Sequence, residues 1–175
     1  MRARLIAAAR ELFADKGYAE TSTPDIVRAA DVTRGALYHH FSDKADLFRA
    51  VARAEAAAVV DAIESVDPGD EGQMAASSRA FFAAMKAPGR ARILLIDGIA
   101  VLGAAEMNDI DAGNGRASLH AGLAALCPDK APEEVEALAK VLSAAYDRAA
   151  LEISEGADEA PFIRAFEALF EGLAT

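Results

Sequence analysis

A short stretch of an otherwise acidic chain gathers cationic and aromatic side chains. The segment "VTRGALYHHFSDK", residues 32–44, places Arg34, Tyr38, two adjacent histidines and Lys44 within eleven residues, whereas the formal net charge of the whole chain is -10. Guanidinium, phenol, imidazole and ammonium groups are donors suited to phosphate oxygens and to the edges of nucleic-acid bases. We therefore expect this segment to meet an anionic partner.

Charge is divided unevenly along the chain. Residues 1–53 contain nine Lys/Arg against seven Asp/Glu, while residues 54–175 contain nine against twenty-one. The first part is therefore at +2 and the remainder at -12. This asymmetry indicates that the N-terminal region meets a polyanion while the acidic remainder stays solvated and repels it.

Length and composition limit the class of protein. With 175 residues, of which 53% are hydrophobic, the chain can bury a core in one or two domains. Its longest apolar run, "ILLIDGIAVLG", is interrupted by Asp97 and falls short of the ~20 residues of a membrane span. The N-terminus mixes charged and apolar residues, unlike a signal peptide, and Cys127 is the only cysteine. We expect a cytoplasmic protein with no membrane partner.

Helical periodicity dominates the sequence. Apolar residues recur at i, i+3, i+4 and i+7 over residues 2–16, and Gly17 follows where a helix end favours a left-handed residue. Hydroxyl side chains are expected to cap the next three helices: Thr23 before residues 24–30, Thr33 before residues 34–40, and Ser42 before residues 43–66. No stretch alternates with period two for long enough to form a strand. The sequence therefore predicts an all-α protein.

The two short helices, joined by three residues, have the layout of a helix-turn-helix. The second would enter the major groove of DNA, where Arg34 near its N-terminus can donate to guanine O6 and N7. Gly35 would let the backbone approach the DNA closely. The residues within reach of phosphate oxygens are Thr33, Tyr38, His39 and Lys44. On spacing alone, an ordinary helical hairpin with these residues at its surface or in its core is the alternative.

Residues 3–51 contain the patterns "AA-x-x-LF-x-x-x-GY", "T-S-x-x-D-I" and "V-T-x-G-x-LY-x-HF-x-x-K-x-x-L". With these patterns, the segment resembles the N-terminal DNA-binding domain of TetR-family transcriptional regulators. The resemblance implies a dimeric, ligand-responsive regulator, usually a repressor, that binds double-stranded operator DNA. The positions that match DNA-contacting residues of the family are Thr23, as a phosphate-contacting cap, and Thr33, Arg34, Gly35, Tyr38, His39 and Lys44.

Two positions depart from the family pattern. Asp31 stands in the turn where the family usually has glycine, but aspartate tolerates a left-handed backbone, so the turn should form with modest strain. Its carboxylate adds negative charge near the DNA. Only Arg2 and Arg4 precede the first apolar stripe, so contacts from an N-terminal arm in the minor groove are not expected.

The chain is expected to divide into a helix-turn-helix DNA-binding domain, residues 1–45, and a helical ligand-sensing and dimerisation domain, residues 46–175. Glycine- and proline-rich breaks separate about five helices in the second domain. The breaks lie at residues 67–73, 87–89, 111–115, 127–132 and 154–161.

The last two predicted helices, residues 132–153 and 161–173, carry long apolar stripes. In TetR-like proteins the last two helices build a four-helix dimer interface, so the resemblance favours a homodimer. The core of a single subunit is the alternative for the same stripes. The expected interface residues are Leu138, Leu142, Ala145, Ala149, Phe162, Phe166, Leu169 and Phe170.

A pocket for a small-molecule effector is expected among the helices of residues 74–153. The carboxylate of Asp97 lies in an apolar run and would need a partner if buried. Its alternative role is a salt bridge to Arg90, Arg92 or Arg148. The candidate ligand residues are Phe81, Met85, Asp97, Met107, His120 and Tyr146, each of which could instead belong to the core.

The sequence lacks the motifs of the common enzyme classes. The sequence contains no G-x-S-x-G, H-E-x-x-H, P-loop or C-x-x-C, and adjacent histidines on a helix diverge too far to hold one metal. We therefore expect no catalysis, cofactor or metal. The sequence predicts a DNA-binding transcriptional regulator, a repressor released from its operator by a ligand. The alternative is a TetR-like helical dimer that has lost DNA binding and holds a ligand or a protein.

Overall fold

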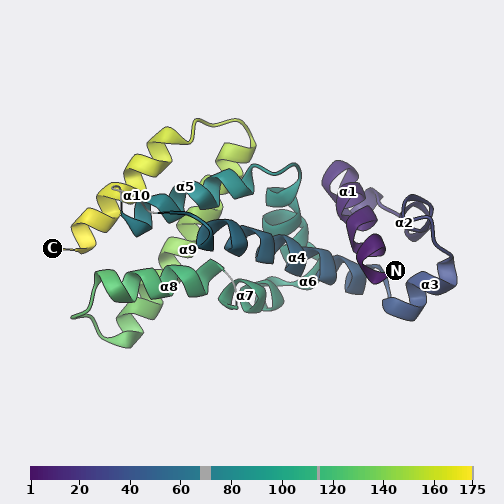
Figure 1. Ribbon diagram of the computed structural model, residues 1–175, viewed down its shortest axis with the longest axis horizontal. Coiled ribbons are helices and arrows are strands. Elements are labelled where there is room, and N and C mark those ends of the chain that lie inside the picture. Colours follow the sequence, from purple (N-terminus) through teal and green to yellow (C-terminus); the bar gives the residue numbers. More distant parts are fainter. Residues whose placement is uncertain (68–71, 114, 175) are drawn as a thin grey trace. The chain divides into compact units, whose positions relative to one another are not determined.

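The computed structural model describes residues 1–67, 72–113 and 115–174, and within these ranges it contains helices and no strand (Figure 1), which confirms the all-α prediction. No helix in these ranges has the length and apolarity to cross a lipid bilayer. The helices and one π-helical turn, η1, follow in the order α1 (Arg2–Glu20), α2 (Thr23–Ala29), α3 (Arg34–His40), α4 (Lys44–Glu64), α5 (Gln73–Met85), η1 (Arg92–Asp97), α6 (Gly98–Leu102), α7 (Ala104–Ala112), α8 (Gly115–Leu126), α9 (Pro132–Ser154) and α10 (Ala160–Leu173).

The helices pack into two compact units. Unit 1 comprises Met1–Glu55 and Pro88–Asn108, and unit 2 comprises Ala56–Ala87 and Asp109–Thr175. Helices α4 and α7 each continue from one unit into the other. These two packing units do not share the boundary at residue 45 that was expected between the DNA-binding domain and the ligand-sensing domain. That functional boundary stays a prediction.

Side-chain caps set where the two short helices begin. Thr33 caps α3 as predicted, because its hydroxyl accepts a hydrogen bond of 3.1 Å from the amide of Ala36. The cap of α2 is Ser22 and not Thr23, since the Ser22 hydroxyl accepts from the amide of Asp25 at 3.3 Å. Thr23 is instead the first helical residue. The predicted cap was therefore wrong by one position.

The start of α4 also differs from the prediction by one residue. A carboxylate oxygen of Asp43 accepts from the amide of Asp46 at 2.7 Å, and the carboxylate of Asp46 accepts from the amide of Ser42 at 3.0 Å. Asp43 is therefore the cap, and Ser42 precedes it. The two carboxylates satisfy backbone donors reciprocally and suit the positive end of the helix dipole.

The turn between α2 and α3 depends on Asp31. Its φ of 49° makes it the only non-glycine residue with positive φ in the described part of the chain, and both flanking helices form, as expected. The guanidinium of Arg4 donates to the carbonyls of Ala30, at 2.7 Å, and Asp31, at 3.1 Å, and lies 3.4 Å from the Asp31 carboxylate. Arg4 therefore supports the strained turn and offsets part of its negative charge.

Helices α1 to α4 bury apolar side chains, among them Ile26 of α2 and Leu37 of α3. The rings of Phe13 and Phe48 meet edge to face with centroids 5.1 Å apart, a favourable arrangement for aromatic pairs. Each fully buried large apolar side chain contributes about 1.5–3 kcal/mol relative to exposure. The buried residues of this core are Leu5, Ala9, Phe13, Ile26, Leu37, Phe41, Leu47, Phe48 and Val51.

The end of α1 is joined to η1 through Asp97. At Gly17 the helix is interrupted by a backbone with φ 81° and ψ 170°, and a Cβ at this position would overlap the guanidinium of Arg92. The next amide, that of Tyr18, donates to the Asp97 carboxylate at 2.9 Å, and Arg92 lies 3.5 Å from the same oxygen. Asp97 therefore takes the ion-pair role that was its alternative.

A buried carboxylate joins α4 to two arginines within unit 1. Glu55 lies 3.2 Å from Arg10 and 2.8 Å from Arg90, and Arg10 also donates to the carbonyl of Pro88 at 2.8 Å. Burial of Glu55 opposes ionisation, but the hydrogen bonds and charges of the arginines outweigh it and lower its pKa. Removing either arginine would leave part of a buried charge uncompensated.

Unit 2 is built around one aromatic-rich core. The rings of Tyr146 and Phe166 stack with centroids 3.8 Å apart, joining α9 to α10. Four of the eight expected dimer residues, Leu142, Ala149, Phe166 and Phe170, are buried here within the single chain. The buried members are Phe82, Leu123, Val135, Ala139, Leu142, Tyr146, Ala149, Ile153, Ile163, Phe166 and Phe170.

The helix breaks lie where composition predicted them, with one addition. Residues 68–71 and 114, which belong to two of the predicted breaks, lie outside the described residues. The break at Gly103, whose φ of 86° separates α6 from α7, was not predicted from the sequence. A single glycine in an apolar run gives too weak a signal to end a helix in the absence of other turn residues.

Gly17→Ala should lower the free energy of unfolding by about 1–3 kcal/mol, because alanine disfavours this backbone and its methyl group would displace Arg92. Gly103→Ala is the matched control, since Gly103 has a similar φ but no atom near the added methyl. Urea denaturation followed by circular dichroism should show the larger loss for Gly17→Ala. Equal losses would mean that Arg92 moves aside at no cost.

Candidate nucleic-acid interface and ligand cavity

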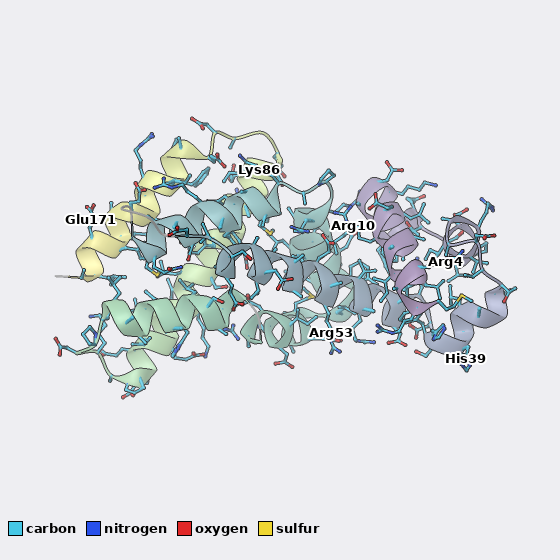
Figure 2. The ribbon with its side chains drawn as sticks, viewed as in Figure 1. Arg4, Arg10, His39, Arg53, Lys86 and Glu171 are labelled. Carbon is cyan, nitrogen blue, oxygen red and sulfur yellow. The ribbon has the colours of Figure 1, made fainter. Side chains whose placement is uncertain are left out.

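Helix α3 turns its polar groups outward and its apolar groups into the core. Leu37 and the following Phe41 are buried, whereas residues spaced by about one helical turn on the opposite side are exposed. Figure 2 shows the side chain of His39 on the outside of this helix. The exposed residues are Thr33, Arg34, Gly35, Tyr38 and His39, all of them predicted DNA contacts.

Three of the predicted contact residues form one cluster across α2 and α3. The guanidinium of Arg34 lies 5.5 Å from the ring centroid of Tyr38, within range of a cation–π interaction. Hydrogen bonds with Thr23 and then Arg34 lower the pKa of Tyr38. Tyr38 is nevertheless 43% exposed, high for a large aromatic residue. The cluster therefore orients a guanidinium and a phenol at the surface.

On the exposed face of α3, Arg34 has no carboxylate partner among the described residues. By contrast, Arg28 pairs with Asp25 at 3.1 Å and Arg4 pairs with Asp31 at 3.4 Å. A guanidinium with free donors can bind two acceptors side by side, such as guanine O6 and N7.

Lys44 is directed partly inward. Its ammonium donates to the carbonyls of Tyr18, at 2.8 Å, and Thr21, at 2.9 Å, and lies 4.0 Å from the Tyr18 ring centroid. Two of its three donors are thus used within the chain. A phosphate contact by Lys44 stays a prediction and would use the remaining donor.

Unit 2 contains a cavity of about 380 Å³, a volume within the usual range of small-molecule sites. Its apolar lining comprises Ile63, Met74, Phe81, Gly115, Leu119, Ala121, Gly122 and Ala125. Its polar lining comprises Glu64, Gln73, Ser77, Asp111, Arg116, Ser118, Ser143, Tyr146 and Asp147.

Two of the six candidate ligand residues, Phe81 and Tyr146, line this cavity. The other four do not. Met85 is buried at the end of α5, and His120 is turned toward Glu136, 3.9 Å away. Asp97 and Met107 belong to unit 1.

The polar residues of the cavity other than Tyr146 were not predicted from the sequence. Asp147 follows Tyr146 on the inward side of α9, but the sequence "YDRAAL" places it beside exposed Arg148, as on an ordinary solvated helix face. Asp111 was assigned to a break between helices. The available signal was the helical spacing of Ser143, Tyr146 and Asp147, which places all three on adjoining positions of one face.

The two aspartates differ in their partners. Asp111 accepts a hydrogen bond of 3.1 Å from Ser143 and lies 3.7 Å from Arg116, although burial still raises its pKa. No hydrogen bond or ion pair joins Asp147 to any other described residue. Burial, followed by the charge of Asp111, raises the pKa of Asp147 to about 7. The cavity therefore holds a carboxyl group that lacks a counter-ion.

Because the pKa of Asp147 is higher in the folded than in the unfolded chain, ionisation costs stability as pH rises from about 4 through 7. Asp147→Asn should remove that cost. At pH 8 it should raise the free energy of unfolding by up to about 4 kcal/mol, and the gain should vanish near pH 4. Urea denaturation across this range measures it.

The control is Asp129→Asn, which changes an exposed aspartate of the same unit and should leave stability nearly constant. A gain for Asp147→Asn that did not vary with pH would contradict the raised pKa.

Comparisons with known proteins agree with this geometry. The profile of the family described as bacterial regulatory proteins, tetR family, matches residues 5–51, and that of the tetracyclin repressor-like C-terminal domain matches residues 72–173. HTH-type transcriptional regulator AcrR of Shigella flexneri is 49% identical over 47 residues, 27% of this chain and 22% of that protein. The chain thus matches only about a quarter of the length of such curated relatives.

Solved structures match over nearly the whole chain. A TetR-family transcriptional regulator from Pectobacterium atrosepticum is 32% identical, with 98% of this chain and 91% of that chain covered and a TM-score of 0.74. BioQ in complex with its double-stranded DNA operator is 23% identical, with 100% and 98% covered and a TM-score of 0.70. At that identity, the likeness to BioQ shows a shared fold.

Proposed function

Because the chain belongs to the tetR family of bacterial regulatory proteins, we propose that it binds operator DNA in the cytoplasm and represses transcription until a small molecule releases it. The exposed face of α3, where Arg34 lies against Tyr38 and has no carboxylate partner in the described part of the chain, supports this proposal. A helical module that has lost DNA binding would have no need of an exposed, oriented guanidinium.

The proposed contacts follow from the exposed face of α3. Arg34 reads a guanine from near the N-terminus of the helix, where side chains reach base edges. Gly35 lacks a Cβ, and its nearest neighbour on that side is the Thr33 hydroxyl, 3.9 Å from where a Cβ would lie, so the phosphate backbone can approach closely. Thr33 and His39 then contact phosphates, which fix the register on the duplex.

We infer a homodimer from the outward faces of α9 and α10. Val141 is 67% exposed and Leu169 50% exposed, and small apolar residues surround them on the same helix faces. Of the residues first expected at the interface, Ala145 and Leu169 are exposed, whereas Leu138 and Phe162 are partly buried. The outward apolar residues are Ala137, Val141, Ala144, Ala145, Ala165, Ala168 and Leu169.

A two-fold dimer would place its recognition helices in successive major grooves, about 34–36 Å apart, on a pseudo-palindromic operator. An effector bound in the cavity of unit 2 would favour a spacing that no longer matches the grooves. Helices α4 and α7 continue from unit 2 into unit 1 and would carry such a change. A coupling of about 1–3 kcal/mol would suffice for regulation.

Arg34→Ala should weaken binding to the cognate operator by about 1–3 kcal/mol and relax the preference for one base in each half-site. The operator would be obtained by genome-wide mapping of bound DNA, and affinities by fluorescence anisotropy. Arg28→Ala removes the same charge from an arginine already paired with Asp25 and should have a smaller effect.

If Arg34→Ala weakened binding equally on every DNA sequence, Arg34 would contact only phosphate. Failure of the native protein to select any DNA sequence would refute the proposed function and favour a ligand- or protein-binding module.

Val141→Asp should yield folded monomers, because it would bury an unpaired charge only in the dimer. Phe166→Asp should unfold the chain instead, since Phe166 stacks on Tyr146 inside one subunit. Sedimentation and circular dichroism on both variants distinguish the two outcomes. A folded dimer of Val141→Asp would place the interface elsewhere.

A further inference from the structure

We propose that the cavity of unit 2 binds an organic cation, a molecule with an apolar, ring-containing body and one positively charged head that pairs with Asp147. The inference rests on the proposed function, in which this cavity is the effector site. It goes further by assigning the chemical class of the effector.

The walls of the cavity suit an apolar body. Phe81 and Tyr146 meet edge to face with ring centroids 5.2 Å apart, and Ile63, Met74 and Leu119 complete the apolar lining. Flat aromatic faces next to methionine and aliphatic carbons accept rings and alkyl chains, and aromatic faces also attract cations. The volume of about 380 Å³ equals that of roughly a dozen liquid waters.

The polar groups of the cavity favour a positive head. Three carboxyl groups line it, those of Glu64, Asp111 and Asp147, against the single guanidinium of Arg116. Asp111 is held by Ser143 at 3.1 Å and by Arg116 at 3.7 Å, and Glu64 is exposed to solvent. Asp147 is therefore the carboxylate that is shielded from solvent and has no partner among the described residues. A carboxylate in an apolar site is costly unless it is paired.

The charge of the ligand head therefore decides how well each class of ligand fits. An ammonium or other cation would supply the missing counter-ion of Asp147. A neutral head would leave the carboxyl group unpaired, and an anionic head would meet the surplus of carboxylates and have to compete with Asp111 for Arg116. The raised pKa of Asp147 is consistent with a site that has no counter-ion until ligand binds.

Three probes that share one body and differ in the head test the charge directly. Isothermal titration calorimetry on the full-length native protein would compare 4-phenylbutylamine, 4-phenylbutan-1-ol and 4-phenylbutanoate near pH 8. The amine should bind at least about tenfold more tightly than the alcohol, the usual gain from a charge-assisted hydrogen bond. The carboxylate should bind most weakly.

Asp147→Asn keeps the shape of the side chain and should reduce amine affinity about tenfold, to the level of the alcohol, while alcohol binding stays unchanged. Asp129→Asn, an exposed change in the same unit, should leave all three affinities unchanged. Circular dichroism checks that both variants are folded. If Asp147→Asn does not fold, the comparison of the three probes on the native protein still tests the proposal.

Equal affinity of amine and alcohol, tightest binding of the carboxylate, or no measurable binding of the amine would each overturn the proposal. An amine that binds through Asp147 but leaves the operator complex intact would preserve the cation site and contradict its role in effector release. If the native protein bound no operator DNA, the proposed function would be contradicted, but the ligand affinities from calorimetry would still test the cation site.

Discussion

Backbone groups left without helical partners at the break in α1 are the constraint on which unit 1 depends. Once Gly17 interrupts the helix, the amide of Tyr18 needs an acceptor from elsewhere, and the carbonyls of Tyr18 and Thr21 at the end of α1 accept further hydrogen bonds from α4. Asp97 supplies an acceptor and Lys44 supplies two donors. The same few hydrogen bonds therefore hold α1, α2, α4 and η1 together. These hydrogen bonds and the buried apolar side chains of α1 to α4 together position the exposed face of α3.

The N-terminal region could be predicted closely from sequence because its signals are local. Thr33 caps α3 and Asp31 adopts the left-handed turn, and both could be predicted from residue types within a few positions along the chain. Periodicity could not decide which side of α9 and α10 faces inward, because both sides are apolar: Phe166 is buried, whereas Leu169 is exposed. The cavity was beyond sequence reasoning, since Asp111 and Asp147 come together only through packing of separate helices.

The carboxyl groups of the two units illustrate opposite uses of burial. Glu55 and Asp97 are matched by arginines or a backbone amide, so their charges join elements of unit 1. Asp147 has no such partner within residues 1–67, 72–113 and 115–174 and is expected to reduce the stability of the chain at neutral pH. Residues that reduce stability are retained where function requires them, which is consistent with a binding site in this cavity.

The π-helical turn has a consequence for how this protein can change during evolution. A π turn holds one residue more than an α turn, and such turns occur mostly as single turns within α-helices. Because the π turn already accommodates that extra residue, deleting one residue between Arg92 and Asp97 would restore regular helix and leave the two flanking segments in nearly the same orientation. Asp97 could then still face Tyr18. This segment should therefore tolerate the loss of one residue, whereas the same deletion in a regular α-helix would rotate one flank by about 100°.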